Sequence, residues 1–478
     1  MLFDALLDEI NGRLAEPGDV PRQERLYRLL KDAVLAGRLG PGARLPATRT
    51  VAARCRMARN CVAYAFEALV AEGFLVADRQ GTRVAELPRA AALAGGEGLP
   101  GLSRRGAGLR GRSVQHTVLP FAPGVPDLNL FPWQAWSRCL QRAWGEVRAR
   151  ELNYAPPGGE PALRAAVAHF LAGWRGVRCT PDEVFILAGA QQALEACARL
   201  LADPGDRVWV EEPGYPVARA TLQGAGLVLE GVPVDGDGIC IQPADWHTRP
   251  PRLVCVTPAH QFPLGSVLSL ERRLALMAGA RAAGAWVIED DYDCDFYHGA
   301  GRPLPALQGL VADGPVIYLG TFSKLMYPGL RLAYLVLPRS LAPDFGEALA
   351  GWQRAGQAVE QRALAQFMES GALLRHHRQM APVYRARQEA LRAALAAHFP
   401  GWSVRGGVAG LHLVLEGAAS LDDRAWAQAI ATRSVVARPL SVYGMEPLVS
   451  PRGLVLGYGV ADARQIPALV ARLAEARF

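Results

Sequence analysis

The spacing of apolar side chains separates a short N-terminal region from a much longer remainder. Between residues 20 and 86, three stretches repeat apolar positions every three or four residues, and two short extended runs follow them. The first stretch places Leu26, Leu30 and Val34 on one face and ends at Gly37, as helices often do. The pattern predicts three helices followed by a hairpin that turns through residues 80–82.

The second and third predicted helices follow each other closely. Thr48 can cap the second helix, which then carries Val51, Ala52 and Cys55 inward. The inward residues of the third helix are Val62, Phe66, Leu69 and Val70, and its outward residues are Arg59, Asn60, Ala63 and Tyr64. A third helix with polar residues exposed at its start is the arrangement by which a recognition helix meets DNA.

The segments on either side of this region differ from it. Residues 1–19 have apolar side chains at helical spacing before Pro17-Gly18, so we expect a short helix that docks on its neighbour. Residues 87–118 consist mainly of Ala, Gly, Pro and Arg without a periodic apolar face. This composition predicts a flexible linker.

From residue 119 onward, strand-like runs alternate with helical stretches. The runs cover residues 184–187, 207–211, 253–257, 286–289, 316–319 and 332–337. Such alternation predicts an α/β fold in which helices cover both faces of a mainly parallel sheet. The last third, from about residue 345, mixes alanine-rich helices with short strands and should form a smaller α/β domain.

Positive charge is concentrated in the N-terminal region. Residues 20–85 hold twelve Arg and Lys against five Asp and Glu, a surplus of seven, and the whole chain has a formal net charge of +7. All other residues therefore sum to zero. A basic segment of this kind indicates a nucleic-acid partner, with solvated surface charge as the alternative.

The cysteines and the hydropathy of the chain indicate the cellular compartment in which the protein is expected. The eight cysteines occur singly, which favours thiols in a reducing cytoplasm over a disulfide framework. No leader segment opens the sequence, and no apolar run approaches the roughly 18 residues of a membrane span. We therefore expect a cytoplasmic protein without a membrane partner.

Lysine is rare in this chain, and its position is informative. Lys31 and Lys324 are the only lysines among 52 Lys and Arg residues. Lys324 follows the strand-like run 316–319 and a Gly-Thr turn, which should place it at the carboxyl edge of the sheet, where α/β sheets bind ligands. An amine, unlike a guanidinium, can lose its proton and attack a carbonyl. The local sequence is equally compatible with a covalent role and with an ordinary surface lysine.

Two further stretches predict chemistry at the same edge. The turn at Gly189 leads from a strand into a helix whose first backbone N–H groups can hold a phosphate, and Arg331, seven residues after Lys324, can reach that phosphate. The carboxylates of residues 289–291 and 293 lie at the end of another strand-like run. No histidine lies between them, so we expect no metal there. Asp290 fits better as the partner of a protonated pyridine nitrogen.

These stretches together resemble fold-type I enzymes of the aminotransferase class, which use pyridoxal 5'-phosphate (PLP). The amino-acid sequences of three motifs are similar to those found in the MocR subgroup of GntR-type transcription regulators. The motifs are Thr257-Pro258-Ala259-His260-Gln261-Phe262-Pro263, Glu289-Asp290-Asp291-Tyr292-Asp293 and Gly320-Thr321-Phe322-Ser323-Lys324. The resemblance implies a winged helix-turn-helix domain over 20–86, a linker over 87–118 and an aminotransferase-like PLP-binding domain over 119–478.

The resemblance also implies a role for individual residues at the cofactor. Lys324 would form the internal aldimine, Asp290 would pair with the pyridinium, and Tyr292 would bond the phenolic oxygen of the ring. Tyr215 would stack on the ring, and Tyr154 would reach the phosphate of the neighbouring subunit, which implies a homodimer. For both of these tyrosines, core packing is the alternative. The phosphate would be held by Ala190, Gln191, Thr321, Ser323 and Arg331.

Two departures from the aminotransferase pattern concern the substrate. The chain reads Phe262-Pro263-Leu264-Gly265 where aminotransferases usually read Asn-Pro-Thr-Gly, so a side-chain amide beside the ring is lost. The usual arginine for a substrate carboxylate, in an Arg-x-Ser/Gly-aromatic strand, is missing from residues 454–458. Arg438 and Arg452 are the substitutes that the sequence offers.

For DNA, the resemblance implies contacts at the second and third helices and at the hairpin. The residues are Arg44, Thr48, Arg49, Arg59, Asn60, Tyr64 and Thr82. The third helix opens with Ala58-Arg59-Asn60-Cys61 where the family has Ser-Arg-x-Thr, so we expect two hydroxyl-to-phosphate contacts to be absent.

We therefore expect a PLP-dependent transcription regulator that binds operator DNA as a homodimer at the nucleoid. It would sense an amino compound or PLP, without physiological turnover, although a residual aminotransferase half-reaction is compatible with this function. The first alternative is an active aminotransferase with an appended DNA-binding module. The second is a regulator with an inactive pocket.

Overall fold

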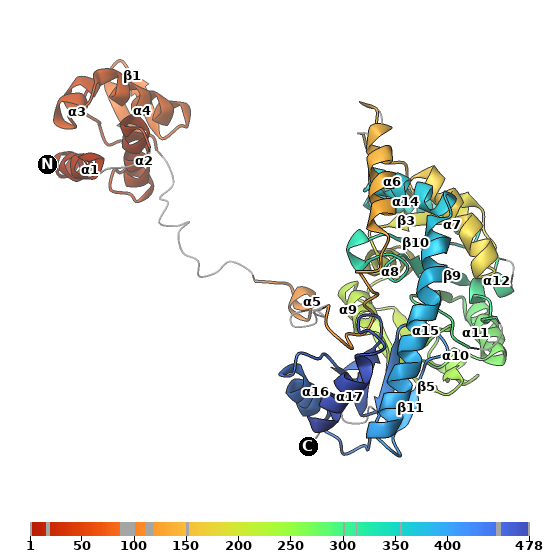
Figure 1. Cartoon of the computed structure of the whole chain (residues 1–478). Helices are drawn as coiled ribbons and strands as arrows, with labels where there is room; N and C mark the ends of the chain where they lie inside the picture. Colours follow the sequence, from red (N-terminus) through yellow and green to blue (C-terminus); the bar gives the residue numbers. More distant parts are fainter. Residues whose placement is uncertain are drawn as a thin grey trace. The chain divides into compact units, whose positions relative to one another are not determined.

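The computed structural model describes residues 2–15, 20–86, 101–109, 118–149, 153–299, 302–311, 313–353, 356–445 and 451–476. Contacts divide the chain into two units, Met1–Leu102 and Ser103–Phe478, both drawn in Figure 1. Most of the expected linker, residues 87–100 and 110–117, lies outside the described residues.

The N-terminal unit combines helices with a two-stranded hairpin. Its elements are α1 (Leu2–Ala15), α2 (Arg22–Leu35), α3 (Thr48–Arg54), α4 (Arg59–Ala71), β1 (Leu75–Asp78) and β2 (Gly81–Val84). The two strands pair antiparallel, and Arg44 forms one further bridge with Arg83. The predicted winged helix-turn-helix is confirmed.

The helix α1 belongs to the core of this unit. Leu7, Ile10 and Leu14 of α1 are buried in the same cluster as Leu26 and Leu30 of α2. Their spacing of three or four residues puts one apolar stripe of α1 against its neighbours. The segment ahead of the winged helix therefore docks on it.

Two details of the predicted helices were wrong. Thr48 is the first residue of α3, whose N-cap is Ala47, and no side chain caps this helix. Val70 of α4 is 37% exposed, while Ala65 is buried in its place. Positions 62, 65, 66 and 69 share one helix face, whereas position 70 lies about 100° from position 69.

The larger unit is built on an eight-stranded sheet in the order β3-β10-β9-β8-β7-β4-β5-β6. Its strands are β3 (Val184–Leu187), β4 (Arg207–Glu212), β5 (Val228–Asp235), β6 (Gly238–Ile239), β7 (Leu253–Val256), β8 (Trp286–Asp291), β9 (Val316–Thr321) and β10 (Ala333–Val336). The strands β5, β4, β7, β8 and β9 are parallel neighbours. β10 runs antiparallel to both β9 and β3. The mainly parallel sheet is confirmed.

Helices cover both faces of this sheet, and strand alternation decides which residues they meet. Ile288 and Ile317 pack towards α8 (Ala190–Leu201), α9 (Pro216–Gly224) and α13 (Ala342–Trp352). Val287 and Val316 pack towards α11 (Leu270–Ala283) and α12 (Leu307–Leu310) on the opposite face. Alternate residues of β8 and β9 therefore belong to different layers.

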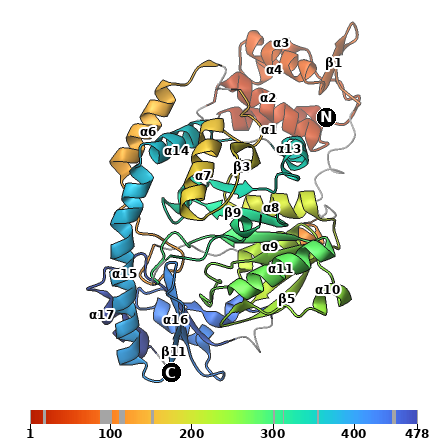
Figure 2. The same ribbon diagram turned by 90° about the vertical axis from the view of Figure 1, so that its right-hand side faces the viewer.

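The remaining helices complete the unit. They are α5 (Arg104–Ala107), α6 (Trp133–Gly145), α7 (Pro161–Trp174), α10 (Asp245–Thr248), α14 (Ala358–Glu369), α15 (Ala372–His398), α16 (Asp423–Ala431) and α17 (Ile466–Glu475). α15 runs down the front of the larger unit in Figure 1 and along its left edge in Figure 2. α5 lies within the expected linker and contacts α9, so part of that segment is structured. None of the helices in the described ranges could span a membrane.

A second sheet forms the smaller C-terminal domain that the sequence predicts. Its order is β11-β12-β14-β13, with β11 (Ser403–Arg405), β12 (His412–Glu416), β13 (Arg438–Pro439) and β14 (Gly453–Gly457), all antiparallel. Leu413 and Leu456 of this sheet share a core with Leu391 of α15, Trp426 of α16 and Leu473 of α17.

Candidate cofactor site and nucleic-acid surface

The candidate site lies at the carboxyl ends of parallel strands in the larger unit. Glu211 lies at the end of β4, Thr257 directly follows β7, Asp290 lies at the end of β8 and Thr321 ends β9. Parallel neighbours bring their carboxyl ends to one edge of a sheet. These polar residues therefore share an edge, and Thr257 donates a hydrogen bond to Glu211 at 2.5 Å.

The carboxylates around the end of β8 are distinguished by their partners. Glu289 accepts hydrogen bonds from backbone N–H groups at the start of α12. Asp291 forms a buried ion pair with Arg175 at 2.8 Å. Asp293 faces a histidine at 3.0 Å. Asp290 is buried on the α8 side of the sheet, and its Oδ1 atom has no hydrogen-bond partner among the described residues.

The electrostatic surroundings of Asp290 favour a cationic partner. Its pKa is raised from 3.8 to about 7, chiefly by burial and next by the neighbouring carboxylates, while the charge of Lys324 lowers it. A buried carboxyl that lacks a donor is destabilised in its ionised form. A protonated ring nitrogen would supply both the missing hydrogen bond and a compensating charge.

Lys324 follows the end of β9 on the same edge. Its amine donates a hydrogen bond to the carbonyl oxygen of Gly124 at 2.5 Å. Burial lowers the pKa of this amine, against the opposing charges of Asp293 and Asp290. A lowered pKa increases the unprotonated fraction, which is the form that attacks a carbonyl. The other lysine, Lys31, lies in the N-terminal unit and pairs with Glu72 at 2.6 Å.

A cradle for a phosphate surrounds the N-terminus of α8. Gly189 caps this helix with φ +97°, and a Cβ atom there would lie 2.6 Å from the guanidinium of Arg331. Residues other than glycine rarely adopt a φ of +97°, so glycine is favoured at this turn. The hydroxyl oxygens of Thr321 and Ser323, which shortly precede Arg331 in the sequence, lie 2.9 Å apart. The first two residues of α8 are Ala190 and Gln191. Backbone N–H groups at a helix start, hydroxyls and an arginine are the usual donors to phosphate.

Aromatic side chains line the region beside Asp290. Phe262 occupies the centre of this group, with ring centroids 5.4 Å from Tyr215, 5.7 Å from Tyr292 and 5.1 Å from Tyr443. Burial raises the pKa of Tyr215 to about 12, and Asp290 adds to the shift. Phe262 therefore contributes an apolar wall at the position where the sequence departs from the usual asparagine.

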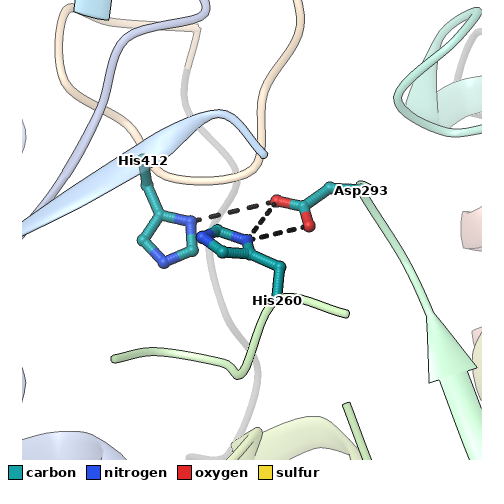
Figure 3. Close-up of side chains that lie close together, drawn as sticks. All are labelled: His260, Asp293 and His412. Atoms are coloured by element: carbon teal, nitrogen blue, oxygen red, sulfur yellow. Dashed lines mark hydrogen bonds and ion pairs between the residues drawn. The ribbon is translucent and has the colours of Figure 1, made fainter. Parts of the chain in front are cut away.

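Two histidines to which the sequence analysis assigned no role join Asp293. Figure 3 shows His260 and His412 beside this carboxylate. Nδ1 of His260 lies 3.0 Å and 3.3 Å from the two carboxylate oxygens, and Nδ1 of His412 lies 4.0 Å from Asp293 Oδ2. The nitrogen and oxygen atoms of the three residues that could act as metal ligands all lie within 4.8 Å of one another. The cluster was missed because His412 comes from β12, far away in sequence.

The two candidate arginines for a substrate carboxylate differ in their surroundings. Arg452 lies 3.6 Å from the buried carboxylate of Asp423. Arg438 in β13 is the register partner of Val455 in β14. Directly opposite residues of an antiparallel pair point to the same face. Val455 packs with Tyr443 in a cluster that Phe262 also touches, so Arg438 shares the face that is turned towards the aromatic residues.

Tyr154 is highly exposed. It lies in the loop before α7, and 73% of its surface is accessible. Core packing, the alternative considered for this tyrosine, does not describe its position in the single chain.

The predicted DNA contacts are distributed over α3, α4 and the hairpin. Arg49 of α3 is exposed, as are Arg59 and Asn60 at the start of α4, and Tyr64 one turn later is 45% exposed. Arg44, exposed, and Thr82, half-buried, belong to the hairpin region, while Thr48 is half-buried at the start of α3. α3 and α4 contact each other directly. These residues can therefore meet a duplex without unfolding of the core.

The residues present at the sheet edge fit PLP. The unpartnered oxygen of Asp290 suits a ring nitrogen, the cradle at Gly189 suits a phosphate, and the amine of Lys324 suits an aldehyde. When bound, PLP supplies an electron-withdrawing ring next to a carbonyl-derived carbon.

Comparisons with known proteins agree on both units. Residues 129–453 match the family model "Aminotransferase class I and II", and residues 22–84 match "Bacterial regulatory proteins, gntR family". The "Probable rhizopine catabolism regulatory protein MocR" of Rhizobium meliloti is 37% identical over 94% of this chain and 92% of its own length. The "HTH-type pyridoxine biosynthesis transcriptional regulator PdxR" of Corynebacterium glutamicum is 31% identical over 96% of each chain.

Among solved structures, the larger unit is similar to an α-aminoadipate aminotransferase, LysN of Thermus thermophilus. That structure is 28% identical, has a TM-score of 0.67 and covers 75% of this chain and 91% of its own. It was solved in complex with N-(5'-phosphopyridoxyl)-L-leucine.

Proposed function

This chain belongs to the MocR-type regulators of the GntR family, and we propose that it regulates transcription by coupling ligand binding at a PLP site to operator binding. It is a transcription regulator in which a winged helix-turn-helix is joined to a domain of the PLP-dependent aminotransferase fold. The observation that supports the proposal most strongly is the buried, unpartnered Asp290 oxygen on the same sheet edge as Lys324.

At the cofactor, Lys324 holds PLP covalently and Asp290 pairs with its ring nitrogen. Tyr292 donates to the phenolic oxygen, and Tyr215 stacks on the ring. The phosphate is bound by Ala190, Gln191, Thr321, Ser323 and Arg331. The lowered pKa of Lys324 supports this assignment, because the unprotonated amine is the form that attacks an aldehyde. The raised pKa of Asp290 supports it in another way: it marks a buried carboxyl that lacks a compensating cation, which a protonated ring nitrogen would supply.

At the DNA, the exposed start of α4 enters the major groove and the hairpin follows the backbone. Arg59, Asn60 and Tyr64 are assigned to α4, and Arg44, Thr48, Arg49 and Thr82 are assigned to phosphates or adjacent base edges. The surplus of seven positive charges in residues 20–85 supports a nucleic-acid partner for this unit. Operator binding places the protein at the nucleoid.

The proposed organisation is a homodimer whose parts are 1–19 as a docking segment, 20–86 as the DNA-binding domain, 87–118 as a linker and 119–478 as the PLP-binding domain. The 73% exposure of Tyr154 supports a role at the phosphate of the neighbouring subunit. Two-fold symmetry would also match the two half-sites of an operator.

The effector is a small amino compound or PLP itself. The names of the two relatives refer to different compounds, rhizopine and pyridoxine, so neither compound is assigned to this chain as its effector. A ligand can shift the regulator only if it binds two of its states with different affinity. Lys324, shortly after the end of β9, would hold PLP, so an amine that competes with this lysine for the cofactor would provide such a difference.

An active aminotransferase is the second candidate, and Arg438 is the observation in its favour. This arginine lies opposite Val455, facing the aromatic residues, and could hold a substrate carboxylate. Steady-state assays with amino donors and a keto acid separate the candidates. Sustained turnover that falls in an Arg438→Ala variant would support the enzyme. Absence of turnover, together with amine-dependent operator binding, would support the regulator.

A further inference from the structure

We propose that His260, held by Asp293, is a positioning residue that directs the hydroxyl hydrogen of Tyr292 towards the cofactor. The inference rests on the proposed role of Tyr292 and adds the group that orients it. His260 comes from the segment after β7, and Tyr292 and Asp293 follow β8. All three lie at the sheet edge that carries the candidate cofactor site.

The contacts of His260 fix the position of its ring hydrogen. Nδ1 lies 3.0 Å and 3.3 Å from the two oxygens of Asp293, and a carboxylate only accepts hydrogen bonds. Nδ1 therefore carries the hydrogen. Nε2 is buried without a hydrogen-bond partner among the described residues, which is less costly for a bare nitrogen than for an N–H group.

The same nitrogen determines what the hydroxyl of Tyr292 can do. The Tyr292 oxygen lies 3.1 Å from His260 Nδ1, and the two rings stack with centroids 6.1 Å apart. Because Nδ1 already bears a hydrogen, it cannot accept one from Tyr292. The hydroxyl oxygen accepts from the shared N–H, and its own hydrogen remains available for another acceptor.

Asp293 is the competing acceptor for that hydrogen. Burial raises the pKa of Tyr292 well above its ordinary value, and the charge and hydrogen-bonding capacity of Asp293 add to the shift, as do the charges of Asp290 and Glu211. The N–H of His260 is shared between the two oxygens of Asp293, satisfies part of their hydrogen-bonding capacity and so weakens this competition. Without that N–H, Tyr292 would turn its hydrogen to Asp293 and away from the cofactor.

His412, which belongs to the smaller sheet, is the third residue of the cluster, but it does not donate a hydrogen bond to Asp293. Its Nε2 lies 2.9 Å from the carbonyl oxygen of Pro263, so Nε2 carries the hydrogen. Burial lowers the pKa of His412 to about 4, which leaves the ring neutral near pH 7. A bare Nδ1 then faces Asp293 at 4.0 Å. His260 is therefore the histidine that can donate to this carboxylate.

The arrangement also depends on glycine at two neighbouring positions. A Cβ atom on Gly410 would lie 2.3 Å from an Asp293 oxygen and 2.4 Å from His260 Nδ1. A Cβ atom on Gly265 would lie 3.0 Å from His260 Nε2. The backbone thus packs directly against both ends of the imidazole, which limits rotation of the ring.

The test compares two amides in place of His260 in the full-length, PLP-loaded protein. His260→Asn keeps an N–H group near the position of Nδ1, whereas His260→Gln carries its amide towards the Nε2 end, where the wild-type nitrogen has no partner. Tyr292→Phe and the double variant His260→Gln/Tyr292→Phe complete a double-mutant cycle. The readout is the pH at which the visible absorbance of bound PLP titrates, with PLP stoichiometry and circular dichroism as folding controls.

The proposal predicts a titration midpoint for each of the four variants. Loss of a hydrogen bond to the ring oxygen should raise the titration midpoint by about one to two pH units in Tyr292→Phe. His260→Gln should raise it similarly, His260→Asn should stay near wild type, and the double variant should match the single ones. An unchanged midpoint in Tyr292→Phe would overturn both the role of Tyr292 and this inference. A shift in Tyr292→Phe that is absent from His260→Gln, or that adds in the double variant, would overturn the inference alone.

Discussion

Asp290→Asn should make the PLP-free protein more stable at high pH while it weakens PLP binding. The wild-type carboxyl is buried, and its pKa of about 7 lies above the ordinary value of 3.8. Between those values the folded protein keeps a proton that the unfolded chain has released. The resulting contribution to stability is fully present below about pH 4 and is lost as pH rises through 7.

The magnitude follows from the size of the shift. About three pH units at roughly 1.4 kcal/mol each set an upper limit on the order of 4 kcal/mol for the cost of ionising Asp290. Asparagine has nearly the same shape but does not ionise, so it avoids this cost. The variant should gain up to that amount over wild type at about pH 8, and the gain should vanish near pH 4.

Cofactor affinity should change in the opposite direction. A hydrogen bond between charged groups contributes about 1.5–3 kcal/mol, so Asp290→Asn should raise the Kd for PLP by roughly 10- to 150-fold. Thermal unfolding of the PLP-free proteins across pH and titration with PLP measure the two effects. If the variant is no more stable than wild type at high pH, burial does not raise the pKa of Asp290 as described. If its PLP affinity is unchanged, Asp290 is not the partner of the ring nitrogen.

Three further predictions concern the cofactor link, the phosphate cradle and the DNA surface. Borohydride reduction of the PLP-loaded protein should leave a pyridoxyl adduct on Lys324, and mass spectrometry that finds it on Lys31 would contradict the assignment. Gly189→Ala should strongly reduce PLP phosphate binding, because alanine rarely adopts the φ of +97° found there and its Cβ would displace the guanidinium of Arg331, and unchanged affinity would show that the phosphate lies elsewhere. Arg49→Ala or Arg59→Ala should cost about 1–3 kcal/mol of operator binding and, for a phosphate contact, reduce the salt slope by roughly one, with PLP absorbance unaffected.

Much of the fold could be predicted because local pattern and tertiary structure agree. Buried runs such as 286–289 and 316–319 lie within β8 and β9, and alternation along β8 also explains why Asp290 faces α8 while Asp291 meets Arg175. The direction of β10 could not be predicted in this way. A short apolar run has the same composition whether its neighbours are parallel or antiparallel.

The chemistry was predictable where it follows a strand end and was missed where it depends on the tertiary fold. Asp290 lies at the end of β8 and Lys324 comes shortly after the end of β9, so sequence position alone puts them at one edge. His412 lies in the second sheet and reaches Asp293 only after the two sheets pack. The pairing of Arg438 with Val455 is likewise a matter of register, which residue order does not reveal.

The coupling between the two units is tested most directly by operator affinity measured with the PLP site in different states. DNA fragments selected by the full-length protein would be titrated without PLP, with PLP, and with PLP plus each of a panel of primary amines, in wild type and in Lys324→Ala. The proposed function predicts that at least one ligand changes operator affinity of the wild type, typically by about 5–150-fold, and that operator DNA changes the affinity for that ligand by the same factor. Lys324→Ala should still bind the operator but should lose the response to amines. Equal operator affinity of the wild type in every state of the PLP site would contradict the coupling.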